Sequence, residues 1–370
     1  MLMKVVMVLN EFRPYGGMQR DCVRMARECV ARGHRVTIVT RAWQGDPLQE
    51  PGIEVALLGQ HGRTNAQRDR RFIFSTQAWL AENPHDVSLA FLRMPGLDAY
   101  FAADPCYEAK VRRLKPAWFR WTPRYRRFAS QERTIFEAGK RTQVMLLHPG
   151  EVTTFQELYD TEPERLHVLP PGIRRPESSA VVNNTLRHEL GLSSDSQLTL
   201  MVGSGFRTKG VDRAIAALPN VPKAHLVIAG QDKAMPFLTQ AAELKVSDRV
   251  HFLGGRDDVD RLMCAADMLV HPAYSENTGT VLLEALVRGL PVIASEVCGF
   301  AYHLSDSAAG IVLPEPFDQG TFNAALQECL QDDTKRLGMR EAGLAYGLAK
   351  DLYSCHHKAV DLLEQIARSP

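Results

Sequence analysis

Short apolar runs alternate with amphipathic stretches along almost the whole chain. The amphipathic stretches, such as residues 18–32 and 72–82, have the spacing of helices. The apolar runs of the first half cover residues 4–10, 35–40, 54–58, 87–92, 144–148 and 166–170. Continuous apolar runs of this length are typical of strands that are buried on both faces of a parallel sheet. The pattern therefore predicts an α/β fold with helices on both faces of such a sheet.

The pattern is interrupted once and then begins again. Pro170-Pro171-Gly172 breaks it, and residues 174–179 have the composition of a linker. Further apolar runs follow at residues 198–203, 225–230, 250–253, 267–271 and 291–295. We predict two doubly wound, Rossmann-like domains, residues 1–172 and 173–370, with a last helix near 355–368 that can pack back on either domain. Such sheets bind ligands at the carboxyl ends of their strands, so we expect the site in a cleft between the domains.

Composition limits the class of protein. A length of 370 residues, 45% hydrophobic and 24% charged residues fit an ordinary globular protein of two domains. The seven cysteines are scattered and form no Cys-x-x-Cys pair, which favours reduced thiols over a disulfide framework or a zinc site. The apolar start is too short for a signal peptide, and no run is long enough to cross a bilayer. These features predict a cytoplasmic protein.

Two carboxylates with seven residues between them, Glu276 and Glu284, are the strongest chemical signal. An apolar run ends just before Glu276, and a helical pattern begins at Gly279 and Thr280. Free backbone N–H groups at a helix start suit a phosphate. Carboxylates beside an anion site make sense when the ligand also carries hydroxyl groups, as a sugar nucleotide does. The alternative is a surface glutamate followed by a glutamate that stabilises the helix.

The first glycine-rich turn, Gly16-Gly17, follows the first predicted strand. Glycines at a helix start let the backbone approach a ligand closely. Asp21 comes shortly afterwards, and we place it in the first turn of the helix, facing the sugar or the attacking hydroxyl. A carboxylate that merely complements the helix dipole is the alternative.

A second glycine-rich turn runs from Gly203 to Gly210 and includes Gly205. It fits neither the dinucleotide fingerprint, because the third glycine comes too late, nor the P-loop, because Lys209 precedes Gly210. We interpret it as a loop that presents Arg207 and Lys209 to a diphosphate, where two cations stabilise the charge of a leaving group. A solvated basic loop is the alternative.

Two further motifs carry less information. Asp258-Val259-Asp260 has the spacing of metal-dependent sugar transferases, but a helical pattern follows it directly, so we predict helix capping. Val297-Cys298-Gly299-Phe300 follows a strand, and we expect it to close one wall of the nucleotide pocket. His356-His357 has no metal partners at helical spacing.

Charge is divided unevenly along the chain. Residues 1–175 carry 27 Lys and Arg against 19 Asp and Glu, whereas residues 176–370 carry 17 against 24. Within the basic half, residues 110–128 hold eight Lys and Arg, two Trp, two Phe, a Tyr and no acid. Interleaved cations and aromatics suit either an anionic membrane surface or nucleic acid, and a solvated basic helix is the alternative. Nucleic acid is disfavoured as a partner because no nucleic-acid-binding module is visible.

Glu276-x7-Glu284, Lys209-Gly210 and Gly16-Gly17 together resemble glycosyltransferase family 4. Other segments resemble, within that family, the glucosyltransferases that add the first hexose to the inner-core heptose of lipopolysaccharide. These segments are residues 16–21, 94–98, 100–104, 161–165, 169–173, 210–213 and 269–274. The resemblance covers essentially the whole chain and implies the two-domain GT-B fold.

The resemblance also implies a retaining transfer from a UDP-sugar that needs no metal, by a protein docked on the cytoplasmic face of the inner membrane through residues 104–133. It places Glu276 at the donor sugar, Lys209 at the diphosphate and Asp21 at the donor–acceptor junction, as the catalytic set, with Glu284 at the ribose. The implied donor-binding set is Gly16, Gly17, Gly205, Arg207, Asn277, Thr278, Gly279, Thr280 and Glu284.

The chain departs from the family pattern at two places. The related glucosyltransferases have Gly-Arg-Lys-Gly where this chain has Arg207-Thr208-Lys209-Gly210, and two alanines where this chain has Asn277-Thr278. The second change lies beside Glu276, so UDP-glucose, UDP-galactose and UDP-N-acetylhexosamines all stay open as donors. Three other functions also stay open at this point: a sugar-nucleotide epimerase of the same fold, a nicotinamide-dependent oxidoreductase using Gly203-x-Gly205, and a non-catalytic membrane-docking protein.

Overall fold

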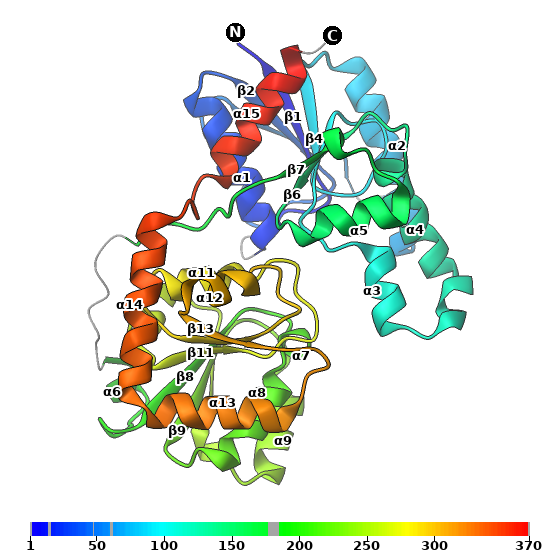
Figure 1. Ribbon diagram of the computed structural model, residues 1–370. Coiled ribbons are helices and arrows are strands. Elements are labelled where there is room, and N and C mark those ends of the chain that lie inside the picture. Colours follow the sequence, from blue (N-terminus) through cyan, green and yellow to red (C-terminus); the bar gives the residue numbers. More distant parts are fainter. Residues whose placement is uncertain (1, 14–15, 47, 60–61, 177–184, 369–370) are drawn as a thin grey trace. The chain divides into compact units, whose positions relative to one another are not determined.

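The computed structural model describes residues 2–13, 16–46, 48–59, 62–176 and 185–368. The chain forms two compact units, Met1–Pro170 with Ser354–Pro370, and Pro171–Tyr353 (Figure 1). Part of the predicted linker, from residue 177 onwards, lies outside the described residues.

The first unit is built on a parallel sheet with seven strands among the described residues. Its strand order is β3-β2-β1-β4-β5-β6-β7. The strands are β1 (Lys4–Leu9), β2 (Arg35–Thr40), β3 (Ile53–Leu57), β4 (Val87–Ala90), β5 (Ala99–Phe101), β6 (Gln143–Leu146) and β7 (Leu166–Val168). The helices are α1 (Gly17–Ala31), α2 (Asn65–Glu82), α3 (Tyr107–Leu114), α4 (Pro123–Phe136), α5 (Gly150–Tyr159) and α15 (Cys355–Arg368), with 3-10 turns η1 (Ala117–Trp121) and η2 (Pro163–Arg165).

Both faces of this sheet are covered by helices. Along β1, Val5, Met7 and Leu9 join the core beneath α1 and α15, while Val6 and Val8 face the core beneath α2, α4 and α5. This alternation at every second residue is what a strand buried on both faces requires. It explains why β1 reads as a continuous apolar run rather than as an alternating pattern.

The last helix, α15, belongs to the first unit, although the whole of the second unit, Pro171–Tyr353, lies between it and β7 in the sequence. Its apolar residues Cys355, Ala359, Val360 and Leu363 are buried in the core that they share with α1. The sequence left open on which domain this helix packs, and in the structure it packs on the first unit, beside α1.

The second unit has a parallel sheet with six strands in its described part. Its order is β10-β9-β8-β11-β12-β13. The strands are β8 (Gln197–Val202), β9 (Ala224–Ala229), β10 (Val250–Gly254), β11 (Met268–His271), β12 (Val292–Ser295) and β13 (Gly310–Leu313). The helices are α6 (Thr185–Glu189), α7 (Phe206–Lys209), α8 (Val211–Ala217), α9 (Met235–Glu243), α10 (Val259–Ala265), α11 (Thr280–Leu286), α12 (Ala301–Ser307), α13 (Gln319–Gln331) and α14 (Asp333–Ala349), with 3-10 turns η3 (Leu218–Asn220) and η4 (Ser247–Arg249).

In both units the strand order reverses direction at one point, between β1 and β4 and between β8 and β11. The carboxyl ends of strands beside such a point form the usual ligand crevice of a doubly wound sheet. Gly16-Gly17 follows β1, the 203–210 turn follows β8, and Glu276 follows β11. The fold thus places each predicted motif beside a switch point of its own sheet.

The α/β prediction is confirmed, with two kinds of local error. The short strands β5 and β13 were not predicted, and α2 begins at Asn65 rather than near residue 72. The earlier start is explained by Thr64, whose side chain accepts a hydrogen bond from the Gln67 backbone N–H and caps the helix. Among the described residues, no helix combines the length and apolarity needed to cross a membrane.

Candidate functional site

The glycine-rich turn after β8 packs closely against the loop after β11. Gly210 has φ +79°, and a Cβ there would lie 2.0 Å from the Pro272 carbonyl oxygen. The Tyr274 backbone N–H donates to the Thr208 carbonyl at 2.9 Å. Only glycine permits both the positive φ and this approach of two backbones, so Gly210 fixes the two loops against each other.

Arg213 holds the same loop from the other side. Its Nη1 donates to the Pro272 carbonyl at 3.0 Å and to the Ala273 carbonyl at 3.1 Å. Its guanidinium also lies 3.6 Å from the centroid of the Tyr274 ring and 3.7 Å from that of Phe317. These contacts satisfy backbone carbonyls that would otherwise lack partners, and they stiffen the segment that carries Glu276.

Lys209 and Glu276, both predicted as catalytic, contact each other directly. The Lys209 ammonium donates to Glu276 Oε2, and His271 Nε2 lies 3.3 Å from the same oxygen. His271 is the last residue of β11 and is fully buried. The three side chains form one cluster at the carboxyl ends of the adjacent strands β8 and β11.

Burial sets the protonation of this cluster. It lowers the pKa of His271 to about 3, and the nearby Lys209 charge acts in the same direction. His271 is therefore neutral near pH 7, and its Nε2–H donates to the Glu276 carboxylate. Burial also lowers the pKa of Lys209, while the Glu276 carboxylate favours the charged ammonium. The result is an ion pair supported by a neutral donor.

The segment after Glu276 has the predicted form. Gly279, at φ +79°, precedes α11, and Glu284 lies in the second turn of this helix. Asn277 is buried, and the Thr278 carbonyl accepts a hydrogen bond from the Phe300 backbone N–H at 2.8 Å. The 297–300 turn therefore supports the start of α11. Its expected role as a wall of the nucleotide pocket stays a prediction, as do the donor contacts of residues 277–280 and Glu284.

The two cations of the 203–210 turn have different surroundings. Gly205, in the left-handed conformation at φ +80°, begins the single turn of α7, in which Arg207 is exposed and Lys209 is partly buried. Residues two apart on a helix do not face each other. Lys209 pairs with Glu276 in the ligand-free structure, and the position of both cations at one diphosphate stays a prediction.

Asp21 lies beyond the first turn of α1, so the prediction that placed it there is wrong. Its Oδ1 is 2.9 Å from His356 Nε2 on α15. The helix-dipole interpretation fails for the same reason, since the dipole acts mainly on the first turn. Gly16 and Gly17 do form the start of α1, so these three predicted residues lie close together in the first unit.

The capping prediction for Asp258 also needs correction. Asp258 stands at the N-cap position of α10, but its side chain makes no capping hydrogen bond. It binds instead to Arg256 at 2.7 Å and Arg261 at 2.7 Å, while Asp260 pairs with Arg288 at 2.6 Å. Strong charge-assisted pairing with two guanidiniums outcompetes the backbone N–H groups.

Sequence reasoning missed two histidines of the site. His271 ends a strand whose other residues are apolar, and a polar residue at the carboxyl end of such a strand is a signal that could have been used. His356 was discounted as a metal ligand, and nothing local to it indicates that Asp21 is its partner. The packing of α15 on the first unit brings His356 and Asp21 together.

Substitution of two glycines should have opposite effects on stability. Gly210→Ala should lower the free energy of unfolding by more than about 2 kcal/mol, because a positive φ and the Pro272 carbonyl both oppose a Cβ.

At Gly17, a Cβ would meet nothing within 4 Å. Gly17→Ala should keep or raise the stability by up to about 1 kcal/mol, yet weaken UDP-sugar binding if the backbone approaches the ligand there. Chemical denaturation measures the stability of both variants, and UDP-sugar titration measures binding. Unchanged binding by Gly17→Ala would show that Gly17 does not contact the ligand.

Comparisons with known proteins agree with this architecture. Residues 15–175 match the model of Glycosyltransferase Family 4, and residues 182–345 match that of Glycosyl transferases group 1. The lipopolysaccharide glucosyltransferase WaaG of Escherichia coli (strain K12) is 42% identical over 370 residues, which is 98% of each chain. The crystal structure of WaaG, a glycosyltransferase involved in lipopolysaccharide biosynthesis, aligns with a TM-score of 0.91 and 41% identity over 97% of this chain and 99% of that one.

A more distant structure shares the fold alone. HepE of Anabaena, solved with UDP and glucose, aligns with a TM-score of 0.75 at 18% identity over 98% of this chain and all of that one. The full-length similarity to WaaG is decisive. The chain belongs to glycosyltransferase family 4, is a glycosyltransferase, and has the GT-B fold. The interpretations as an epimerase, an oxidoreductase or a non-catalytic docking protein are therefore set aside.

Proposed function

We propose that this protein transfers a hexose from a UDP-sugar to the inner-core heptose of lipopolysaccharide, with retention of the anomeric configuration. The observation that carries the proposal is the 42% identity with the Escherichia coli lipopolysaccharide glucosyltransferase across 98% of both chains. UDP-glucose is the first donor to test. Asn277 and Thr278, which replace two alanines of the family pattern, keep UDP-galactose and UDP-N-acetylhexosamines as further donors.

The cluster of Lys209, Glu276 and His271 supports a specific order of events at the donor. Without a ligand, Lys209 pairs with Glu276. The diphosphate of the donor would compete for the Lys209 ammonium, which frees the Glu276 carboxylate to accept from the hexose hydroxyls. Neutral His271 donates a hydrogen bond to Glu276 and so holds its carboxylate in place. It adds no positive charge to the cluster, whose cation is Lys209. Glu284 is proposed to accept from the ribose.

The transfer itself then requires charge stabilisation and one proton transfer. As the bond between the anomeric carbon and the phosphate oxygen breaks, the negative charge on UDP is stabilised by Lys209, with Arg207 as a second cation. The acceptor hydroxyl attacks from the face that UDP leaves, and its proton passes to the departing phosphate oxygen. Asp21, held by His356, is proposed to orient the acceptor at this junction.

We propose that the reaction requires no metal ion, because Lys209 and Arg207 supply the positive charge at the diphosphate. Within the described ranges, no group of three or more His, Cys, Asp or Glu residues is arranged to hold a metal ion. The carboxylates of Asp258 and Asp260 are engaged with arginines. A metal-free mechanism leaves stabilisation of the leaving diphosphate to Lys209 and Arg207.

The test of the proposal is UDP release in the presence of different donors and acceptors. The protein is incubated with each UDP-sugar, with and without heptose-terminated lipopolysaccharide. Acceptor-dependent UDP release supports transfer. Equal release without acceptor, or none with any donor, would contradict the proposed function.

We further propose that the protein docks on the cytoplasmic face of the inner membrane through α3, η1 and the start of α4. Trp118 and Trp121 on η1 are 60% and 76% exposed, and Leu114 beside them is 45% exposed. Exposed aromatics surrounded by cations suit the interface of an anionic bilayer. Three of the cations are engaged elsewhere, however, since Arg112 and Arg120 each bind Glu108 at 2.8 Å and Arg127 binds Asp69 at 3.4 Å.

Arg113, Lys115 and Arg126 are exposed and form no ion pair among the described residues, so they are the cations to test. Changing all three to Gln should reduce co-sedimentation with anionic vesicles by roughly tenfold or more, at about 1 kcal/mol per residue. The control is the same change at Lys223, Lys233 and Lys245 of the second unit. Equal sedimentation of both triple variants, or equal binding of the wild type to zwitterionic vesicles, would contradict electrostatic docking.

A further inference from the structure

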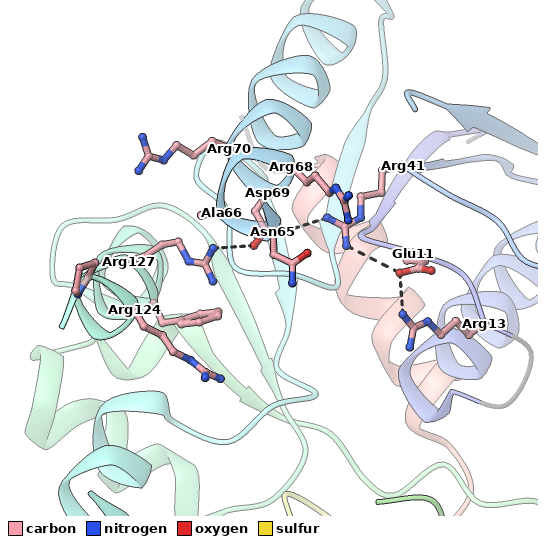
Figure 2. A pocket seen from close by; sticks show the side chains of 12 residues that line it. Glu11, Arg13, Arg41, Asn65, Ala66, Arg68, Asp69, Arg70, Arg124 and Arg127 are labelled. Atoms are coloured by element: carbon pink, nitrogen blue, oxygen red, sulfur yellow. Dashed lines mark hydrogen bonds and ion pairs between the residues drawn. The ribbon is translucent and has the colours of Figure 1, made fainter. Parts of the chain in front are cut away.

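The first unit contains a large basic pocket that the donor site does not use. It has a volume of 820 Å³ and lies beyond the carboxyl ends of β1 and β2 (Figure 2). Four segments supply its walls: the loop after β1, the residue that follows β2, the start of α2 and the start of α4. The charged side chains among its lining residues are Glu11, Arg13, Arg41, Arg68, Asp69, Arg70, Arg124 and Arg127.

Ion pairs fix part of this wall. Arg13 pairs with Glu11 at 3.0 Å, and Arg41 lies 3.9 Å from Glu11 and 3.0 Å from Asp69. Asp69 also pairs with Arg127 at 3.4 Å. Figure 2 shows these contacts as one chain of alternating charges across the pocket. Each carboxylate therefore holds two guanidiniums in position while neutralising only one of them.

The positive charge is not balanced within the pocket. Six arginines face two carboxylates, an excess of four positive charges. Arg68 donates only to the Gly62 carbonyl, at 3.0 Å, and the exposed Arg70 and Arg124 take part in no ion pair among the described residues. Arg41 Nε and Arg127 Nε are buried and have no hydrogen-bond partner in the described part of the chain. Such a concentration of like charge is unfavourable unless an anion offsets it.

We infer that this pocket binds anionic substituents, phosphate or carboxylate, of the saccharide acceptor. The inference rests on the proposed function and names the chemistry that this unit recognises. Guanidinium groups bind phosphate and carboxylate oxygens through two parallel hydrogen bonds. An excess of four charges fits a ligand with several anionic groups rather than one. The volume lies within the range of pockets that enclose a small molecule, so it can take a sugar together with its substituents.

The pocket and the proposed membrane-docking surface share the start of α4 but differ in their other residues and in character. Carboxylates hold three of the pocket's six guanidiniums, those of Arg13, Arg41 and Arg127. Docking on head groups instead uses mobile cations beside exposed apolar rings. Neither Trp118 nor Trp121 is among the lining residues. The pocket therefore fits a defined oligosaccharide better than a lipid surface.

The test compares two double variants with the same change of charge. Arg70→Gln/Arg124→Gln removes two exposed arginines of the pocket, one on α2 and one on α4. Arg71→Gln/Arg133→Gln removes two exposed arginines of the same helices that do not line it. Calorimetry measures binding of a delipidated, phosphorylated, heptose-terminated core oligosaccharide to each full-length protein. UDP affinity and thermal unfolding check that the fold is intact.

The pocket variant should bind the oligosaccharide at least about tenfold more weakly, since a charged hydrogen bond contributes about that factor or more. The control should bind like the wild type, and the difference should shrink as salt rises. If dephosphorylating the oligosaccharide abolishes the difference, the bound groups are phosphates; if the difference persists, they are carboxylates. Both results support the inference.

Two results would overturn it: equal affinity of the two double variants for the oligosaccharide, or loss of vesicle binding by the pocket variant with oligosaccharide affinity unchanged. The second result would assign the pocket to lipid head groups. Because the assay measures binding, it also separates this inference from the proposed function. Suppose that the wild type binds the oligosaccharide tightly through these arginines but transfers no sugar. That result would support the binding role of the pocket and contradict the proposed transferase activity.

Discussion

Glu276→Gln is expected to lower turnover by about tenfold to a hundredfold and to leave UDP affinity unchanged or higher. The proposed partner of Glu276 is the hexose, and a hydrogen bond to a charged group contributes about 1.5–3 kcal/mol. Glutamine keeps the size of the side chain but ends its ion pair with Lys209. The Lys209 ammonium then meets the diphosphate without competition, so UDP itself should bind at least as well.

The measurement is kcat at saturating donor, together with the dissociation constant of UDP from calorimetry. Glu284→Gln is the matched control, because it removes a carboxylate from the same segment but at the proposed ribose contact. That variant should lose UDP affinity. A parallel loss of turnover and UDP affinity in Glu276→Gln would place Glu276 at the nucleotide instead of the sugar.

Lys209→Ala should lose UDP affinity and turnover together. Its ammonium is the partly buried cation of the cluster, so its loss should weaken UDP binding by roughly tenfold to a hundredfold. Arg207→Ala is the matched comparison from the same helical turn. Because Arg207 is exposed, water and salt weaken its interaction, and its effect on UDP binding should be several-fold smaller.

Magnesium distinguishes this account from a metal-dependent one. Added magnesium should not restore Lys209→Ala, and a chelator should leave the wild type active. Complete loss of wild-type activity in the chelator would contradict the metal-free mechanism, because Lys209 and Arg207 would then be insufficient to stabilise the leaving diphosphate.

The sequence allowed the layered fold to be predicted because strands buried on both faces leave continuous apolar runs. Val5 to Leu9 is such a run, and its alternate residues fill two separate cores. The strands β5 and β13, of three and four residues, were missed, although strands of the same length such as β7 and β4 were predicted. Runs of that length cannot be told from apolar turns by periodicity.

The candidate site was predictable only where local patterns define it. Lys209 and Glu276 each follow an apolar strand, so their position at the carboxyl edge could be predicted. Their contact could not, because it depends on β8 and β11 being neighbours in the sheet. The pairing of Asp21 with His356 joins residues 335 positions apart. It depends on which unit α15 packs against, and an amphipathic helix alone does not specify its partner.

The basic pocket was only partly visible in the sequence. The excess of Lys and Arg in residues 1–175 indicated an anionic partner for this half. The aromatic-rich stretch at 110–128 accounted for much of that charge and pointed to a membrane. In the structure Arg124 and Arg127 line the pocket together with arginines that follow β1 and β2 and with arginines of α2, and neither exposed tryptophan lines it.

The most direct test of the central claim is the structure of the product. UDP-glucose is incubated with delipidated, heptose-terminated lipopolysaccharide, and the product is examined by mass spectrometry and by NMR of the new anomeric centre. We expect the acceptor to gain one hexose, linked in the same anomeric configuration as in the donor, and only when donor, acceptor and protein are all present. An inverted linkage, or release of UDP with no hexose on the acceptor, would contradict the account.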